Sequence, residues 1–430
     1  MKKNFKLYIG LAALALATSC KPSLDEFEPA KGSADFSQFI AVGNSLTSGY
    51  ADNGLYLAGQ RVAFPNLMAE QFKTVGGGAF TSPFFSEAEA NGSGYLRLKG
   101  FDENGSPETE FVPAQAERGK NALGNPLYTK HTDPIQNLGV PGMRLDLAFA
   151  EIFGSQFGNP YFERLLPENQ VGKTTYMQYA VSQEHTFFSF WLGNNDVLGY
   201  SMNGAAATDD PTKTMISVAQ FTQLYNAFIN GLTAKQQKGV VATIPDVTVV
   251  PFFNTVTLQM INAGLAANPA TANLKLLIKT KTGVRPAEEG DLFGLTFRAN
   301  IARFGQNGYG FSPLNPIEDS AVLDKAEVAE VLQRIKELNA VIKQVADSKD
   351  LALADVNAFL NKVKAGYNYN GVHISAAFIT GNAFSLDGIH LTPIGNAVVA
   401  NVFIDAINAK YNSKVPKIDV SKYGGVSFPN

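Results

Sequence analysis

Four short segments of the sequence combine glycine with polar residues in a way that could support nucleophilic chemistry. They are Gly43-Asn44-Ser45, the glycine Gly142, Gly193-Asn194-Asn195-Asp196 and Asp387-Gly388-Ile389-His390. A serine hydroxyl becomes a good nucleophile when a histidine takes its proton and an acid orients that histidine. Ser45, His390 and Asp387 have the residue types for these three roles.

Attack by a serine on a carbonyl group also requires hydrogen-bond donors for the developing oxyanion. The backbone N–H groups of Ser45 and Gly142 and the side-chain amide of Asn195 are the candidates. Asp196 is interpreted as a structural residue that holds its loop in place. Each segment alone is weak evidence, since Gly-Asn-Ser is an ordinary turn, but their order along the chain makes the set informative.

The elements that must position these residues follow from the hydrophobic pattern. Four apolar runs are typical of buried parallel strands, and each ends in a polar loop. They cover residues 39–42, 186–192, 239–244 and 351–355. Helices are expected at 64–72, 218–237, 324–346 and 393–409. Asp324 and Glu327 are expected to form a capping box at the start of the third helix. Thr392 and Pro393 are expected to occupy the N-cap and first position of the last helix. Strands that alternate with helices predict an α/β fold, in which functional residues gather at the carboxyl ends of the strands.

Two long segments do not follow this rhythm. Residues 51–130 and 254–320 are interpreted as insertions into one domain that spans 38–413, followed by a C-terminal tail at 414–430. Because both insertions emerge from loops near the functional edge of the sheet, they could form a lid or one wall of the substrate site. That hypothesis fails if they pack at the opposite edge.

The amino terminus has the pattern of an export signal. Residues 1–19 combine three lysines with a short apolar stretch, and 20–37 are expected to form a flexible polar tether broken by proline and glycine. The position of Cys20 resembles the lipobox of bacterial lipoproteins, so lipidation at Cys20 is expected, with an ordinary signal peptide and an incidental thiol as the alternative. The resemblance implies anchoring at the bacterial outer membrane, facing the periplasm or the cell surface.

Composition excludes several other classes of protein. The chain of 430 residues is 45% hydrophobic and 17% charged, which suits a large folded core. Its net charge of −3 argues against a basic surface of the kind that binds nucleic acid. Cys20 is the only cysteine, so an internal disulfide and a cysteine-based metal site are excluded.

Together the four segments resemble the SGNH or GDSL family of serine hydrolases, whose conserved blocks contain a Ser, a Gly, an Asn and a His. Ser45 matches the first block, Gly142 the second and Asn195 the third, while Asp387 and His390 match the last. The resemblance implies a three-layer α/β/α, flavodoxin-like fold with a central parallel sheet and long loop insertions. One departure is Asn44, which stands where the family name gives Asp.

The resemblance implies an extracytoplasmic serine esterase that hydrolyses carboxylic esters through an acyl-enzyme, with no metal and no cofactor. Its expected partners are a small-molecule, lipid or glycan ester and a membrane, reached through the lipid anchor. Two alternatives stay open at this point. One is a carbohydrate esterase that removes acetyl groups from glycans, and the other is a non-catalytic lipoprotein that binds glycan or lipid.

Overall fold

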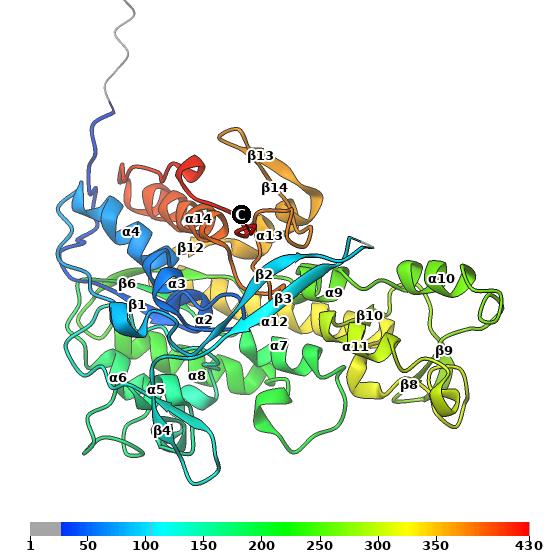
Figure 1. The fold of residues 1–430 in the computed structure, drawn as a ribbon. Helices are drawn as coiled ribbons and strands as arrows, with labels where there is room; N and C mark the ends of the chain where they lie inside the picture. The colour runs from blue at the N-terminus through cyan, green and yellow to red at the C-terminus, as the bar shows by residue number, and fades with distance from the viewer. Residues whose placement is uncertain (1–26, 104, 430) are drawn as a thin grey trace, which may run out of the picture.

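The centre of the fold is a four-stranded parallel sheet. The computed structural model describes residues 27–103 and 105–429. In it β1 (Phe39–Gly43), β6 (Phe187–Trp191), β7 (Lys238–Ala242) and β12 (Ala352–Ala354) pair in the order β1-β6-β7-β12, all parallel. These are the four apolar runs that the sequence predicts as strands. The sheet lies inside the molecule, between helices (Figure 1).

The segment 136–140 runs alongside the free edge of β1. Ala41 donates its N–H to the Gln136 carbonyl at 2.8 Å, and the Leu138 N–H returns to the Ala41 carbonyl at 2.8 Å. The Val140 N–H donates to the Gly43 carbonyl at 3.1 Å. With this irregular segment counted second, the spatial order is 2-1-3-4-5, the flavodoxin-like arrangement, whose ligands bind where the strand order reverses.

Helices cover both faces of the sheet. On one face α14 (Pro393–Tyr411) packs on β12 and on α4 (Phe64–Lys73). On the other face α12 (Lys325–Ser348) contacts β7 and α8 (Val218–Leu232), which in turn contacts α6 (Tyr176–Val181). The two groups of helices lie above and below the sheet in Figure 1. The predicted three-layer α/β/α architecture is confirmed.

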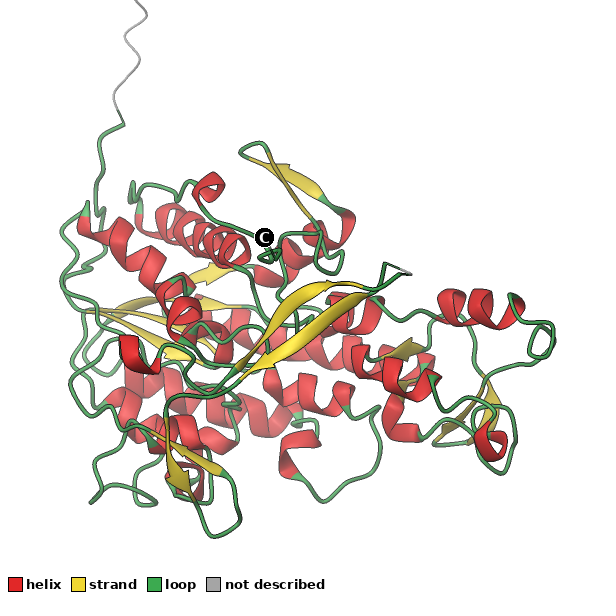
Figure 2. Ribbon diagram, viewed as in Figure 1, coloured by secondary structure: helices red, strands yellow, loops and turns green. Residues whose placement is uncertain are grey.

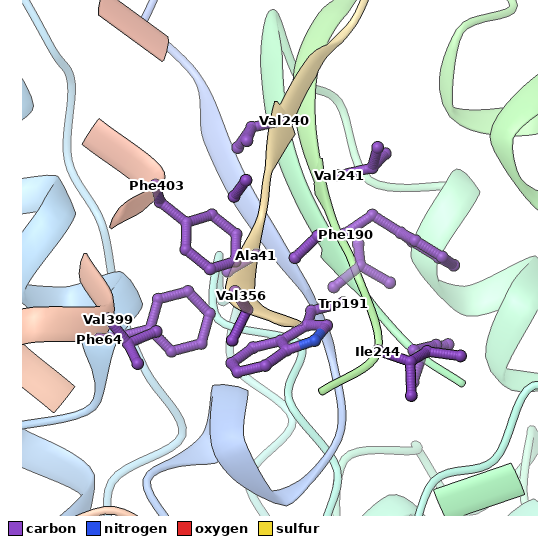
Figure 3. Close-up of a cluster of buried hydrophobic side chains, with 14 of the residues drawn as sticks. Ala41, Phe64, Phe190, Trp191, Val240, Val241, Ile244, Val356, Val399 and Phe403 are labelled. Carbon is purple, nitrogen blue, oxygen red and sulfur yellow. The ribbon is translucent and has the colours of Figure 1, made fainter. Parts of the chain in front are cut away.

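The core on the two faces follows the alternation of side chains along β6. Trp191 packs against the rings of Phe64 and Phe403, each with centroids 5.7 Å away. Its neighbour Phe190 points to the opposite face and meets Phe228 at 4.9 Å. Figure 3 shows Phe64 and Phe403 on one side of the strands and Phe190 on the other. Successive residues of a strand point to opposite faces, so both layers of helices are fastened by one strand.

Sequence signals define several helix ends correctly. Asp324 and Glu327 form the predicted capping box at α12, and the Thr392 side chain accepts from the Gly395 N–H at the start of α14. Helix α8 ends at Leu232, before the predicted end at residue 237. The chain there turns toward β7 with Gln236 at φ +63°, a left-handed conformation that cannot continue a helix.

The first insertion contributes to the body of the fold. It contains α3 (Leu57–Arg61), α4, the hairpin β2 (Tyr95–Phe101) with β3 (Pro107–Val112), and the pair β4 (Glu117–Lys120) with β5 (Pro126–Tyr128). Helix α4 is part of the layer that covers the sheet. The β2–β3 hairpin crosses in front of the central elements in Figure 2.

The second insertion has a small hydrophobic core of its own. It contains α10 (Leu258–Ala266), α11 (Arg298–Ile301), β8 (Leu277–Thr280), β9 (Gly283–Pro286) and β10 (Leu292–Phe293). Ile261, Ile278 and Phe293 are buried together there, apart from the main core. These elements extend to one side of the central sheet (Figure 1).

Smaller elements complete the α-helices and β-strands of the described chain. They are α2 (Ser45–Ser48), α5 (Pro160–Glu163), α7 (Asn195–Met202), α9 (Pro251–Asn254), α13 (Val356–Ala365), β11 (Val322–Leu323), β13 (Tyr367–Tyr369) and β14 (Val372–Ile374). None of the helices among residues 27–103 and 105–429 combines the length and the apolarity needed to span a bilayer.

Both ends of the described chain pack on the main body. Phe36, within the range assigned to the tether, is buried in the main core, and Ala30 pairs with Lys414. In the range assigned to the C-terminal tail, Val415 and Val420 are buried in the same core. The predicted export signal at 1–19 and the lipidation site Cys20 lie outside the described residues.

Candidate active site

The serine of the first segment lies at a sharp turn from strand to helix. Ser45 is the first residue of α2 and follows β1 by a single residue, Asn44. The Asn44 side chain accepts a hydrogen bond from the Leu46 N–H at 3.1 Å and so caps the short helix. A Cβ atom on Gly43 would come within 2.0 Å of the Thr47 Oγ1 atom, so this turn requires glycine at position 43.

A continuous chain of hydrogen bonds joins Ser45, His390 and Asp387. The distance from His390 Nε2 to Ser45 Oγ is 2.9 Å, and that from His390 Nδ1 to Asp387 Oδ2 is 2.8 Å. With Nδ1 donating to the carboxylate, Nε2 is left to accept the serine proton. Only 14% of the His390 side chain and 9% of the Asp387 side chain are exposed. The Tyr50 ring packs against the imidazole with centroids 4.8 Å apart.

The Asp387 carboxylate is saturated with donors. Its Oδ1 accepts from the backbone N–H groups of Ile389 and His390 at 2.9 and 2.8 Å, and from Ser385 Oγ at 3.2 Å. Its Oδ2 accepts from the Asn53 N–H at 2.9 Å as well as from the imidazole. Burial raises the pKa of Asp387, but His390 and these hydrogen bonds outweigh it and hold the pKa well below its usual range.

The first insertion supplies part of this support. Besides the Asn53 contact, the Asp52 N–H donates to Ser385 Oγ at 3.0 Å, and the Asp52 carboxylate accepts from the Leu386 N–H at 2.9 Å and from the Tyr56 hydroxyl at 2.6 Å. Asp52 and Asn53 both have positive φ, +53° and +61°. Burial raises the pKa of Asp52, and the bonds from Tyr56 and Leu386 oppose that rise.

These supporting residues were not foreseen from the sequence. The turn signal Asp52-Asn53-Gly54 marks a tight turn, but it gives no sign that the turn contacts the loop at residues 385–390.

Two of the predicted oxyanion donors, Gly142 and Asn195, belong to segments that contact each other. Gly142 has φ +77°, which only glycine adopts freely, and the Asn159 side chain donates to the neighbouring Pro141 carbonyl at 2.7 Å. Asn195 Nδ2 donates to the Met143 carbonyl at 2.9 Å, which leaves its second hydrogen free. Within the described chain, the backbone N–H groups of Ser45 and Gly142 donate to no other protein group.

A buried charged cluster ties these two loops together. Both carboxylate oxygens of Asp196 accept from the Leu145 N–H, at 3.1 and 2.9 Å. Arg144, 1% exposed, donates to the Asn195 carbonyl at 3.0 Å and pairs with Asp146 at 2.7 Å. Burial raises the pKa of Asp196 to about 6, against the opposing effect of Arg144. Asp196 therefore holds its loop down, as the sequence analysis interpreted it, and Arg144 is a partner that the sequence did not reveal.

A small apolar cavity lies next to these loops. It has a volume of about 40 Å³ and is lined by residues that adjoin the predicted site residues, among them Leu46, Asn194 and Ile389. Leu198 of α7 and Val250 add to its walls, and Trp191, Val356 and Val399 of the main core line it as well.

Both insertions contact the loop that carries Asp387. The first does so through Asn53, and at the border of the second the Phe252 N–H donates to the Gly388 carbonyl at 2.9 Å. A Cβ on Gly388 would lie 3.4 Å from the Leu295 side chain of the second insertion. Neither insertion therefore packs at the opposite edge of the sheet.

No metal site is evident in the described part of the chain. No group of three or more His, Cys, Asp or Glu side chains there could hold a metal ion. What the arrangement offers is a serine hydroxyl, an imidazole ready to accept its proton and a charged acid behind that imidazole, the set used in nucleophilic catalysis of acyl transfer.

Comparison with known proteins gives one family match. The model of the GDSL-like lipase/acylhydrolase family matches residues 39–403. No curated protein matches the chain in sequence.

Several solved structures resemble the chain distantly. One is an α/β hydrolase from the metagenome of Lake Arreo, with 12% identity over 88% of this chain and 97% of that chain and a TM-score of 0.37. Another is an acetylxylan esterase from Geobacillus stearothermophilus, with 11% identity over 87% of this chain and 95% of that chain and a TM-score of 0.35. An extracellular lipase from Streptomyces rimosus is similar at 11% identity, over 86% of this chain and 99% of that chain, with a TM-score of 0.34. Likenesses as weak as these say nothing about the ester that this chain cleaves.

The family match covers most of the chain, from β1 to α14, and includes all the segments that carry the site. The resemblance of the four segments to the GDSL family, inferred from the sequence, is confirmed. The chain belongs to the GDSL-like lipase/acylhydrolase family and is a hydrolase of ester bonds.

Proposed function

We propose that this protein is a serine esterase that cleaves carboxylic esters of short acyl groups through an acyl-enzyme intermediate. The observation that carries the proposal is the unbroken hydrogen-bond chain Ser45 Oγ, His390 Nε2, His390 Nδ1 and Asp387 Oδ2. A protein that only binds glycan or lipid has no need of this chain, so its presence argues against the non-catalytic alternative.

In the first step Ser45 Oγ attacks the ester carbonyl while its proton passes to His390 Nε2. Asp387, whose hydrogen bonds keep it ionised, stabilises the imidazolium that forms and fixes the ring orientation. His390 then gives the proton to the departing alcohol. Water, deprotonated by the same imidazole, attacks the acyl-serine, and the imidazolium returns that proton to Ser45 Oγ as the acid is released.

The negative charge on the carbonyl oxygen needs donors that are already in place. The N–H groups of Ser45 and Gly142 and the free hydrogen of Asn195 Nδ2 are assigned to it. Arg144 and Asp196 keep the two donor loops in register and do not themselves touch the substrate. Loss of one oxyanion donor costs about 10²–10³ in kcat in comparable enzymes.

The apolar cavity lined by Leu46 and Ile389 supports a short acyl group. Its volume of about 40 Å³ exceeds the roughly 10–15 Å³ that one water molecule needs, but is far below the space for a long fatty chain. Leu46 follows the nucleophile, Asn194 precedes Asn195 and Ile389 precedes the base, so three walls of the cavity are chain neighbours of the site residues, and we place the acyl tail there. Acetyl esters of glycans, the alternative left open by the sequence, also have an acyl group of this size.

The test is hydrolysis of chromogenic esters from acetyl to long acyl chains by the wild type, Ser45→Ala and Ser48→Ala. Ser48 is a matched control, because its hydroxyl is buried one helical turn away and donates to the Ser45 carbonyl at 2.9 Å. We expect Ser45→Ala to lose about 10³-fold or more in kcat and Ser48→Ala to stay within about tenfold of the wild type. An active Ser45→Ala enzyme would refute the acyl-enzyme, and a preference for long chains would refute the short acyl group.

A further inference from the structure

One polar side chain without a partner lines the apolar cavity between Leu46 and Ile389. Asn194, 4% exposed, lines it, and neither its Oδ1 nor its Nδ2 forms a hydrogen bond in the described part of the chain. Asn194 is the only described side chain with two such buried, unpaired atoms. It also starts α7 without capping that helix through its side chain.

The other side chains around the cavity are apolar or already satisfied. Leu46, Leu198 and Ile389 line it with carbon atoms, and the Trp191 N–H donates to the Thr243 carbonyl at 3.2 Å. A buried amide without a partner destabilises a folded protein, because it has lost its bonds to water and gained none in return. A pocket meant only for a hydrocarbon tail would be served better by leucine at position 194.

We propose that Asn194 is a specificity-determining residue that selects an acyl group carrying its own hydrogen-bonding group, such as a hydroxyl. The inference rests on the proposed esterase function and names the substrate class of the same site. The acyl carbonyl lies at Ser45, the short tail enters the cavity between Leu46 and Ile389, and its hydroxyl pairs with the Asn194 amide. Leu198 and Val250 enclose the carbon atoms of the tail.

Sites that hydrogen-bond a substrate hydroxyl discriminate strongly against the analogue that lacks it, since the buried amide is then left unpaired. Two pairs of esters differ only in a hydroxyl that replaces a methyl group of equal size. They are 3-hydroxypropionyl against butyryl, and 2-hydroxypropionyl against isobutyryl. The quantity to measure is the ratio of kcat/KM for the hydroxylated ester to that for its apolar twin.

The experiment compares this ratio in the wild type, Asn194→Leu and Leu198→Met. Intrinsic differences in ester reactivity cancel when the ratios of two enzymes are compared. We expect Asn194→Leu to lower the ratio by about tenfold or more and to raise the melting temperature, because an unpaired amide is removed. Leu198→Met alters the walls that enclose the tail without a change in polarity, so kcat/KM for both esters of a pair should change together and their ratio should stay within about twofold of the wild type.

An unchanged ratio in an active Asn194→Leu enzyme would overturn the inference and leave the esterase function intact. If Asn194→Leu does not fold, Asn194→Ala, which removes the same amide and adds no bulk, gives the ratio. A wild type that hydrolyses none of the four esters, and no other ester of the chromogenic series, would refute the proposed function together with the inference.

Discussion

Replacement of Asp387 by Asn is the substitution whose outcome the structure determines most tightly. Three donors converge on Oδ1, namely Ser385 Oγ and the N–H groups of Ile389 and His390. The amide oxygen of an asparagine must therefore occupy the Oδ1 position. Its NH₂ group then replaces Oδ2, where it faces the Asn53 N–H and the imidazole Nδ1.

The consequence for the base follows directly. An NH₂ group cannot accept a hydrogen bond, so Nδ1 must become the acceptor and the proton of the neutral ring moves to Nε2. His390 then presents a proton to Ser45 Oγ at the position where it should take one. In serine proteases the corresponding change lowers kcat by about 10⁴, which is about 5 kcal/mol of transition-state stabilisation. The Asn53 N–H is also left unpaired, at a cost of about 1–3 kcal/mol of folding stability.

The assay is kcat and KM for a short acyl ester at pH 7, together with urea unfolding of each variant. Asp52→Asn is the matched control, since Asp52 is a second buried acid at the same loop. There an amide oxygen can still accept from the Leu386 N–H, and the Tyr56 hydroxyl can accept from the new NH₂. We expect Asp52→Asn to stay within about tenfold of the wild-type kcat.

Retention of more than about a tenth of the wild-type kcat by a folded Asp387→Asn enzyme would refute this reasoning. A loss confined to KM would also count against it, because the argument concerns the proton on the imidazole and not the binding of the ester.

Replacing Arg144 by Met tests the support of the two oxyanion loops. We expect the free energy of unfolding in urea to fall by about 3–5 kcal/mol and kcat to fall with little change in KM. An unaltered kcat would show that the loops keep their register without Arg144. The depressed pKa of Asp387 predicts a pH dependence of stability: the folded pKa lies below the ordinary value of 3.8, so the stabilisation is present above about pH 4 and is lost as the pH falls. The free energy of unfolding should therefore fall more steeply below about pH 4 in the wild type than in Asp387→Asn, and parallel curves would contradict the assigned hydrogen bonds.

The part of the fold that the sequence reveals is the part encoded in local patterns. The strands β1, β6, β7 and β12 are short apolar runs that end in polar loops, and such runs are visible without any knowledge of their partners. The capping box at Asp324 and the Thr392-Pro393 start of α14 are likewise local signals, and both are confirmed. Helix α8 ends earlier than its sequence pattern predicts because of tertiary context, since the chain must leave the helix at Leu232 to enter β7.

The three residues Ser45, Asp387 and His390 could be named from the sequence because their chemistry resides in side chains. The groups around them could not. Asn53 acts through its backbone N–H, which every residue except proline has, so its identity carries no signal. Arg144 is charged and would be expected on the surface, and only the folded structure shows that it is buried behind Asn195.

The contact between Asn53 and Asp387 limits how this enzyme can be dissected or rebuilt. A shortened protein that keeps the sheet, its flanking helices and all three of Ser45, His390 and Asp387 would retain every residue that a motif search recognises. It would nevertheless lack the backbone donor to Asp387 Oδ2 and the Asp52 bridge to Ser385. Segment 51–130 is therefore not a detachable module, and a loop transplanted from a relative must reproduce the left-handed pair at 52 and 53 before the imidazole can be held correctly.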